Sequence, residues 1–187
     1  MALKTMKKRI CGFCLTIAVI GVASHGVAQE KAAPSRTRVG AGIDGAAIIL
    51  DYARPGIAAE SGTTNKSLAG VVPYNKVWPI GGSSPGLLIS DRDLVIGKAI
   101  VPAGTNSLYA MVGEDGSAKL VISKQIAGGE AGYDPAQDVA RVDMEKQTLP
   151  RTVDPLTLAV VMEPAGGGTL KMMIDRTQFS ARFFVRK

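Results

Sequence analysis

Four side chains in the first half of the chain have the chemistry of a ligand site: Tyr52, Arg54, Tyr74 and Trp78. Aromatic rings beside a fixed guanidinium group suit sugars, peptides or anionic ligands, because rings stack and the guanidinium forms directed hydrogen bonds. The structural alternative is that the rings pack in the core or at its rim, and that the arginine pairs with Asp51 or with a carbonyl group. The sequence therefore predicts either one binding pocket formed by these four residues or a packing role for them.

The residue types most often used for nucleophilic and metal chemistry occur only near the start of the chain. Cys11 and Cys14 are the only cysteines, and His25 is the only histidine. The Cys-x-x-Cys spacing occurs in redox and metal sites, but its place in the first 28 residues argues against such a role. Without this segment the chain has no thiol nucleophile, imidazole base, disulfide, Cys/His zinc site or Ser-His-Asp triad. We therefore expect no catalytic residues of these types, no metal and no cofactor.

The first 28 residues have the pattern of a secretory signal peptide. Four basic residues precede an apolar run from residue 10 to residue 23, and Gly26-Val27-Ala28 provides small residues before a cleavage point. The apolar run is shorter than the roughly 20 residues that a membrane anchor needs. We expect cleavage after Ala28, export to the periplasm or the medium, and no membrane span in the mature chain.

Cleavage changes both the size and the charge of the chain. Removing 28 of the 187 residues leaves 159, which suits one domain that buries roughly 70% of its unfolded-chain surface. The removed segment contains four of the 22 basic residues, so 18 remain against 16 acidic residues, a net charge of +2. The basic residues that remain do not cluster as they do on a nucleic-acid-binding surface. We therefore expect no nucleic acid among the partners.

Acidic residues offer the remaining candidate chemistry. Asp91 and Asp93 flank Arg92 before a strand, and strand alternation points both carboxylates to one face. A calcium ion needs about six oxygen ligands, which the neighbouring residues do not supply, so we interpret this segment as a solvated turn. A hydrolase acting on carbohydrate would need two carboxyl groups on either side of the bond it cleaves, and no motif identifies such a pair.

Short β-rich runs bounded by Gly, Pro, Asp and Ser recur along the chain, without a convincing amphipathic helix pattern. Runs of this kind at spacings of roughly 8–14 residues are typical of an antiparallel sandwich or barrel. The sequence predicts an all-β fold: a single antiparallel β-sandwich of about nine strands, jelly-roll or immunoglobulin-like, preceded by a signal-peptide helix. The sandwich domain is predicted at residues 44–187, after a flexible lead at residues 29–43. The main runs are 46–52, 87–89, 94–96, 108–112, 119–123, 138–145, 156–162, 170–174 and 179–185.

Turn chemistry predicts how the middle of the chain folds back on itself. Gly97-Lys98, between two apolar runs, is typical of a two-residue hairpin. The segment 101–104, Val-Pro-Ala-Gly, fits a type I turn. Together these turns predict an antiparallel meander across residues 94–112. The Gly-rich loop at 164–169 predicts a hairpin between the strands on either side of it.

Short motifs occur in a definite order along residues 44–185: DYARP (51–55), VPYNKVW (72–78), LVIGK (94–98), PAGT (102–105), SLY (107–109) and DVARV (138–142). Taken together, they make the chain resemble a family of exported bacterial proteins known as domain of unknown function (DUF) 2911. The resemblance implies a β-sandwich and an exported protein. It implies no activity, because none is assigned to the family.

The chain departs from the pattern of that family directly after Trp78. Where family members usually continue Arg-Thr-Gly-Ala-Asn-Glu-Ala-Thr, this chain reads Pro-Ile-Gly-Gly-Ser-Ser-Pro-Gly. Pro79, Ser83 and Ser84 therefore replace the Arg, Asn and Glu. If those polar residues form a site in relatives, this chain has lost or rebuilt it.

These observations favour an exported β-sandwich that binds a small ligand, a glycan or a partner protein without catalysis. The ligand-binding residues in this hypothesis are Tyr52, Arg54, Tyr74 and Trp78. One alternative is a carboxylate-based hydrolase acting on carbohydrate. The other is a structural protein of the cell envelope that presents sheet edges to a partner.

Overall fold

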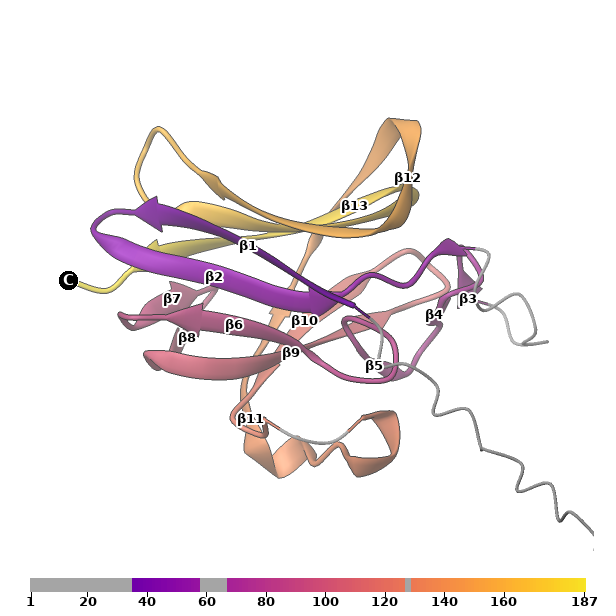
Figure 1. The fold of residues 1–187 in the computed structure, drawn as a ribbon, viewed down its shortest axis with the longest axis horizontal. Helices are drawn as coiled ribbons and strands as arrows, with labels where there is room; N and C mark the ends of the chain where they lie inside the picture. The colour runs from indigo at the N-terminus through magenta and orange to yellow at the C-terminus, as the bar shows by residue number, and fades with distance from the viewer. Residues whose placement is uncertain (1–34, 58–66, 127–128) are drawn as a thin grey trace, which may run out of the picture. The chain divides into compact units, whose positions relative to one another are not determined.

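The fold is taken from a computed structural model that describes residues 35–57, 67–126 and 129–187. The described chain contains thirteen strands, β1 to β13, arranged in a seven-stranded sheet, a four-stranded sheet and a two-stranded pair. The prediction of an all-β fold with two antiparallel sheets is therefore confirmed, with more strands than the nine expected (Figure 1). The predicted signal peptide at 1–28 lies outside the described residues.

The seven-stranded sheet forms one layer of the domain. Its strands follow the order β1-β2-β6-β9-β10-β11, and β5 pairs with β9 beside this path. Each of these pairings is antiparallel. The strands are β1 (Arg36–Ile43), β2 (Ala46–Ala53), β5 (Val77–Pro79), β6 (Gly86–Ser90), β9 (Gly104–Val112), β10 (Ala118–Ser123) and β11 (Asp138–Asp143).

The four-stranded sheet forms the other layer and follows the order β12-β13-β7-β8. Its long β12–β13 hairpin confirms the turn predicted at 164–169, and its register is interrupted between Thr148 and Val153 and between Val153 and Thr157. A separate pair consists of two short strands, β3 and β4. The bounds are β3 (Ser67–Leu68), β4 (Val72–Pro73), β7 (Leu94–Ile96), β8 (Ala99–Val101), β12 (Glu145–Met162) and β13 (Gly168–Val185).

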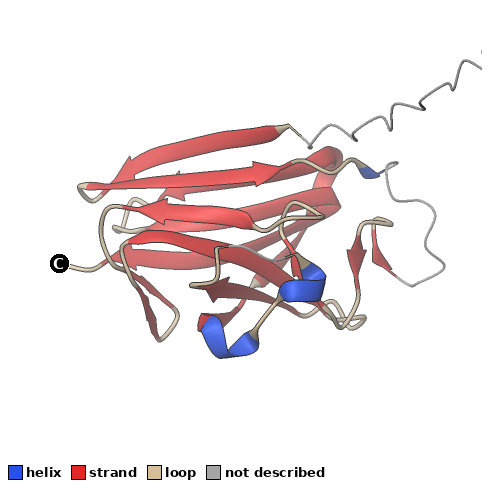
Figure 2. Cartoon of the chain, turned by 60° about the horizontal axis from the view of Figure 1, so that its bottom comes forward, coloured by secondary structure: helices blue, strands red, loops and turns tan. Residues whose placement is uncertain are grey.

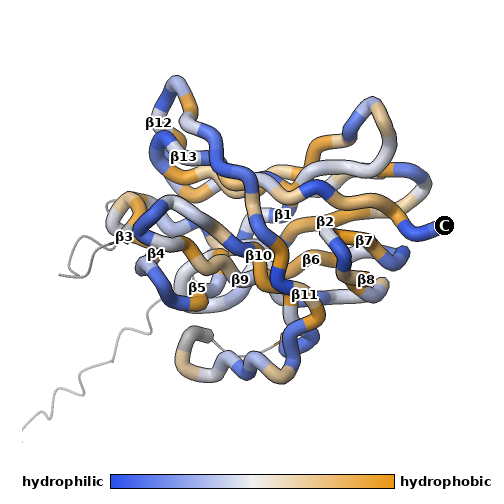
Figure 3. The backbone as a smooth tube through the Cα atoms, turned by 180° about the vertical axis from the view of Figure 1, so that it is seen from behind, coloured by the Kyte–Doolittle hydropathy of each residue, from blue (hydrophilic) through white to orange (hydrophobic). Residues whose placement is uncertain are grey.

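Strand alternation builds one hydrophobic core from both sheets. Leu108 of β9 and Leu120 of β10 belong to the same cluster of buried side chains as Leu158 of β12 and Phe183 of β13. In Figure 3 the hydrophobic stretches follow β6, β9 and β10 through the middle of the domain. Tyr109, next to Leu108, is equally buried but lies outside that core cluster. The seven-stranded sheet therefore has an inner face that packs in the core and an outer face on which some side chains, such as Tyr109, are also buried.

The first strand corrects the predicted domain boundary. Residues 36–43, expected to belong to a flexible lead, form β1, which pairs with β2 along its whole length. Arg36 and Arg38 of β1 both form ion pairs with Asp51 of β2, at 2.6 and 2.7 Å. The polar composition that suggested a lead is explained by these pairs, because they place the charged side chains of an edge strand against a partner strand.

The middle of the chain is only partly the predicted meander. The hairpin at Gly97-Lys98 is confirmed, since β7 and β8 pair across it and Gly97 has a φ angle of 61°. However, β8 and β9 do not pair with each other, because they belong to different sheets. The turn at 101–104 therefore carries the chain from one layer to the other instead of continuing a meander.

The connection between β10 and β11 contains two short 3-10 helices, η2 (Glu130–Gly132) and η3 (Pro135–Gln137). Figure 2 shows both as blue turns beside the seven-stranded sheet. Asp134 caps the second, since its Oδ1 accepts a hydrogen bond from Ala136 N–H at 2.9 Å. In the described part of the chain, no helix has the length and apolar character needed to cross a membrane.

Candidate functional site

Tyr52, in β2, and Arg54, directly after β2, bind β12 of the opposite sheet. The hydroxyl of Tyr52, a residue only 1% exposed, accepts a hydrogen bond from Leu158 N–H at 2.9 Å and donates one to Leu158 C=O at 3.4 Å. Arg54 donates from Nε to Leu156 C=O at 3.2 Å and from Nη2 to Thr157 Oγ1 at 3.0 Å. Because β12 lies at an edge of its sheet, these side chains satisfy backbone groups that lack a strand partner.

We expect Tyr52→Phe to lower the free energy of unfolding by about 1–3 kcal/mol, because it leaves buried backbone groups of Leu158 unpaired. Urea denaturation of both proteins measures the difference. The matched control is Tyr74→Phe, whose hydroxyl has no hydrogen bond with the described residues, and the expected change there is below about 0.5 kcal/mol. Equal losses in the two variants would contradict the bridging role of Tyr52.

Trp78 and Tyr74 are also in packing positions. Trp78 is 3% exposed, belongs to the core cluster and pairs in register with Ala110 of β9. Tyr74 is partly buried against the same core and forms a parallel bridge with Val112. The structure thus places the three predicted rings in or against one core, whereas Arg54 is exposed. These positions fit the packing alternative, and a joint ligand site of the four residues stays a prediction.

A different group of polar and aromatic side chains gathers on the outer face of the seven-stranded sheet. The registers of β9, β10 and β11 place Tyr109 and Arg141 in one row across the sheet, and Ser107 and Asp138 in the next. Tyr133, from the connection after β10, packs on Tyr109 with ring centroids 4.9 Å apart and ring planes inclined at 57°. We call Tyr109, Tyr133, Asp138 and Arg141 the outer cluster.

Three short hydrogen bonds join Tyr133, Asp138 and Arg141. The hydroxyl of Tyr133 donates to Asp138 Oδ2 at 2.6 Å, and Arg141 Nε donates to the same oxygen at 2.7 Å. Arg141 Nη2 donates to the hydroxyl of Tyr133 at 2.7 Å. The side chain of Arg141 is 40% exposed and that of Asp138 only 10%. A largely buried carboxylate thus holds a guanidinium group that reaches solvent.

The surroundings keep both tyrosines of the outer cluster protonated. Burial, followed by the hydrogen bond to Asp138, raises the pKa of Tyr133 to about 12. Burial and then the negative charge of Asp138 also raise the pKa of Tyr109 above its ordinary value. Since both shifts favour the neutral phenol, the hydrogen bond from Tyr133 to Asp138 persists at neutral pH.

In an alkaline titration, we expect the tyrosine ionising near pH 12 to be Tyr133. Because its folded pKa lies above the ordinary value of 10.0, its contribution to stability is present below pH 10 and is lost as the pH rises through about 12. Ultraviolet absorbance of the phenolate measures the titration, and Tyr133→Phe should remove this step. Survival of the step in the variant would assign it to another tyrosine.

Two buried oxygen atoms on the outer face have no hydrogen-bond partner among the described residues: Ser107 Oγ and Asp138 Oδ1. Buried polar atoms are normally paired, since leaving one unpaired costs about 1–3 kcal/mol. Asp138 therefore uses one carboxylate oxygen to hold Tyr133 and Arg141 and keeps the other as an unused acceptor.

Sequence reasoning did not identify the outer cluster as a site, although Tyr109, Asp138 and Arg141 lie in the SLY and DVARV motifs. Strict alternation would place Asp138 and Arg141, three residues apart, on opposite faces of β11. A shift of register between Ile122 and Ser123 of β10 brings both onto the outer face. A bulge of this kind depends on strand pairing and leaves no clear local pattern.

The segment after Trp78, where the chain departs from the family pattern, borders the outer cluster. Pro79 of β5 pairs in register with Tyr109 of β9. The carbonyl oxygen of Ser83 lies so close to Gly129 that a Cβ atom there would be 2.7 Å from it. The loop after β5 thus touches the connection that contains Tyr133, so two of the three altered positions neighbour this site.

Asp91 and Asp93, considered as calcium ligands, bind protein donors instead. Asp91 Oδ1 accepts from Ala47 N–H at 2.8 Å. Asp93 accepts from Ala103 N–H at 3.0 Å and from Arg186 Nη1 at 3.2 Å. These contacts agree with the interpretation of a turn. Across residues 35–57, 67–126 and 129–187, no three His, Cys, Asp or Glu side chains are placed to hold a metal ion.

Comparison with known proteins identifies the family of the chain but no individual protein that it matches. Residues 34–183 match the family described as Protein of unknown function (DUF2911). The match extends from just before β1 into the end of β13, which confirms the resemblance inferred from the motifs. No curated protein and no solved structure matches the chain.

Proposed function

The chain belongs to the DUF2911 family of proteins of unknown function, and we propose that it is an exported, non-enzymatic binding module. Its ligand contacts the outer cluster. The observation that supports this function is Arg141, whose guanidinium group is fixed by two short hydrogen bonds beside packed tyrosine rings and whose side chain is still 40% exposed. A side chain already held in one orientation loses little entropy on binding, which favours recognition of a ligand.

The chemistry of the described residues favours binding over catalysis. The chain has no cysteine or histidine after residue 25, so thiol and imidazole-activated nucleophiles are missing from the domain. Hydrogen bonds from Arg36 and from Ser117 lower the pKa values of Asp51 and Asp115, respectively. These shifts favour the ionised form of these two carboxylates, so neither of them is suited to act as a general acid at neutral pH.

Export is supported by the pattern of residues 1–28. Fractionation of cells that express the full chain tests it against a variant lacking residues 2–28. The full chain should be shortened and found outside the cytoplasm, and the variant should be retained. An unshortened chain in the cytoplasm would contradict export.

A thermal-shift screen against glycans, metals and anions tests the binding function. A ligand that binds the folded state raises the melting temperature by mass action. We expect a ligand that stabilises the wild-type protein to stabilise Arg141→Ala much less. The control, Arg38→Ala, removes a different arginine–aspartate pair from the same face. If every stabilising ligand acts equally on the three proteins, the site lies elsewhere.

A groove beside β11, β12 and β13 favours the hydrolase as a second candidate function. It has a volume of about 450 Å³ and is lined by Asp143, Glu145, Glu163 and Phe184, among others. Carboxyl pairs cleave glycosidic bonds, and the 46% exposed Phe184 provides a ring for stacking on a sugar. Release of reducing sugar that is lost in Glu145→Gln or Glu163→Gln would support this function. Absence of turnover would contradict the hydrolase and leave the binding module as the proposed function.

A further inference from the structure

Building on the proposed function, we propose that the ligand of the outer cluster is a neutral sugar. Two neighbouring hydroxyl groups of the sugar accept hydrogen bonds from Arg141, and its apolar face packs against Tyr133. The free donors of Arg141, the charge around them and the position of the tyrosine ring support this assignment.

Arg141 has donors that the protein does not use. A guanidinium group has five N–H donors in one plane. Asp138 and Tyr133 occupy one donor on Nε and one on Nη2. The donors that remain, on Nη2 and Nη1, have no partner among the described residues. One N–H from each terminal nitrogen forms a fork that matches two oxygen atoms side by side, as in a carboxylate, a phosphate or a pair of adjacent sugar hydroxyls.

The charge around Arg141 favours a pair of neutral sugar hydroxyls over a carboxylate or a phosphate. The carboxylate of Asp138 lies 2.7 Å from Nε and compensates the positive charge of the guanidinium. An anion would therefore gain little from this arginine, whereas sugar hydroxyls need no net charge to accept its hydrogen bonds.

Tyr133 supplies the apolar part of the site. Its ring is only partly buried, packs on the buried ring of Tyr109, and is held by the hydrogen bonds to Asp138 and Arg141. Rigid aromatic rings with a few convergent polar groups are the usual lining of small-molecule sites.

Isothermal titration calorimetry with glucose, galactose, cellobiose and glucuronate tests the inference. We expect a neutral sugar to bind, and Arg141→Lys, which keeps the charge but removes the fork, to raise its Kd by about tenfold or more. Tyr133→Leu, which removes the ring, should have an effect of similar size. Melting temperatures of the variants show whether each one is folded, and Tyr133→Phe provides a variant that retains the ring.

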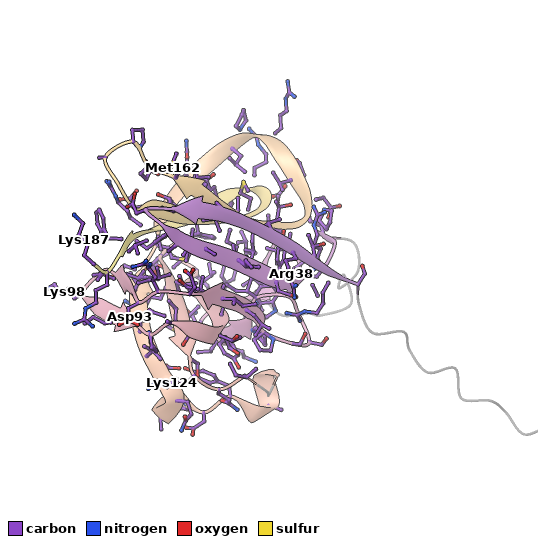
Figure 4. The ribbon with its side chains drawn as sticks, turned by 60° about the vertical axis from the view of Figure 1, so that its left-hand side comes forward. Arg38, Asp93, Lys98, Lys124, Met162 and Lys187 are labelled. Atoms are coloured by element: carbon purple, nitrogen blue, oxygen red, sulfur yellow. The ribbon has the colours of Figure 1, made fainter. Side chains whose placement is uncertain are left out.

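Arg38→Lys is the matched control. Arg38 lies on β1, away from Lys124 at the start of the connection after β10 (Figure 4). Its Nε and Nη2 both donate to Asp51 Oδ2, at 3.2 and 2.7 Å. It is thus a second carboxylate-anchored guanidinium on the outer face, and its replacement should leave the Kd unchanged. An equal loss in both arginine variants would overturn the assignment to Arg141.

Three results would overturn the assignment of a neutral sugar as the ligand without contradicting the fold. No binding of any neutral sugar is the first. Tighter binding of glucuronate than of glucose, with an affinity that falls as salt rises, is the second and indicates an anion site. The third is a non-sugar ligand from the thermal-shift screen that depends on Arg141, which leaves the binding module intact. If no ligand of any class depends on Arg141, the placement of the binding site at the outer cluster falls as well.

Discussion

Trp78→Ala should lower the free energy of unfolding by about 3–5 kcal/mol, because it removes a large buried ring and leaves a cavity. The ring is 3% exposed and belongs to the core cluster. A loss of this size is a large fraction of the about 5–15 kcal/mol that stabilises a typical domain. Urea denaturation followed by circular dichroism measures it, since the variant lacks the only tryptophan and its fluorescence.

Trp78→Phe separates the packing role of Trp78 from the predicted ligand site. The smaller ring keeps apolar packing, so the expected loss is well below that of the alanine variant. A stacking role for Trp78 would appear as lost ligand binding in a phenylalanine variant that unfolds like the wild type. That result would support the site formed by Tyr52, Arg54, Tyr74 and Trp78 over the outer cluster.

Phe183→Ala is the second substitution with a large expected effect, again about 3–5 kcal/mol of unfolding free energy. Phe183 is fully buried in the core cluster, and its ring leaves no space for a side chain at Gly168, where a Cβ atom would lie 2.6 Å from Cζ. The cavity left by the alanine would therefore lie between the two ends of β13, which contact each other at Gly168 and Phe183. Thermal and urea denaturation should both show the loss.

Phe184→Ala is a control one residue away. Strand alternation turns Phe184 to the opposite face of β13, where it is 46% exposed and Arg182 lies 5.0 Å from its ring centre. Its replacement removes an exposed cation–π contact, so the expected loss is below about 1 kcal/mol. Similar losses at the two positions would contradict the alternation of β13.

The strands with a clear local pattern were predicted from the sequence. β10 and β11 alternate or run apolar between turn residues, and both were located near their observed bounds. The first half of β12 was missed, because residues 145–155 are mostly exposed and offer no hydrophobic alternation. β1 was missed for a related reason: its side chains alternate between exposed and partly buried, and its charges are matched only by Asp51 of the next strand.

The outer cluster was predictable in its chemistry but not in its place. An arginine beside aromatic rings was expected at Arg54 and Trp78, where a ligand site stays a prediction, and the structure presents the same combination at Arg141 and Tyr133. Whether a tyrosine packs in the core or faces outward depends on strand register. A single shift between Ile122 and Ser123 is enough to move Asp138 to the face of Arg141.

The sequence by itself determined the all-β class, the family, the hairpins at 97–98 and 164–169 and the lack of cysteine and histidine after residue 25. These are properties of composition and of short segments. Only the tertiary structure decided which strands share a sheet and which aromatic rings are buried in the core. The reason is distance along the chain: the hydroxyl of Tyr52 is matched by a backbone group 106 residues away, and no local pattern contains both partners.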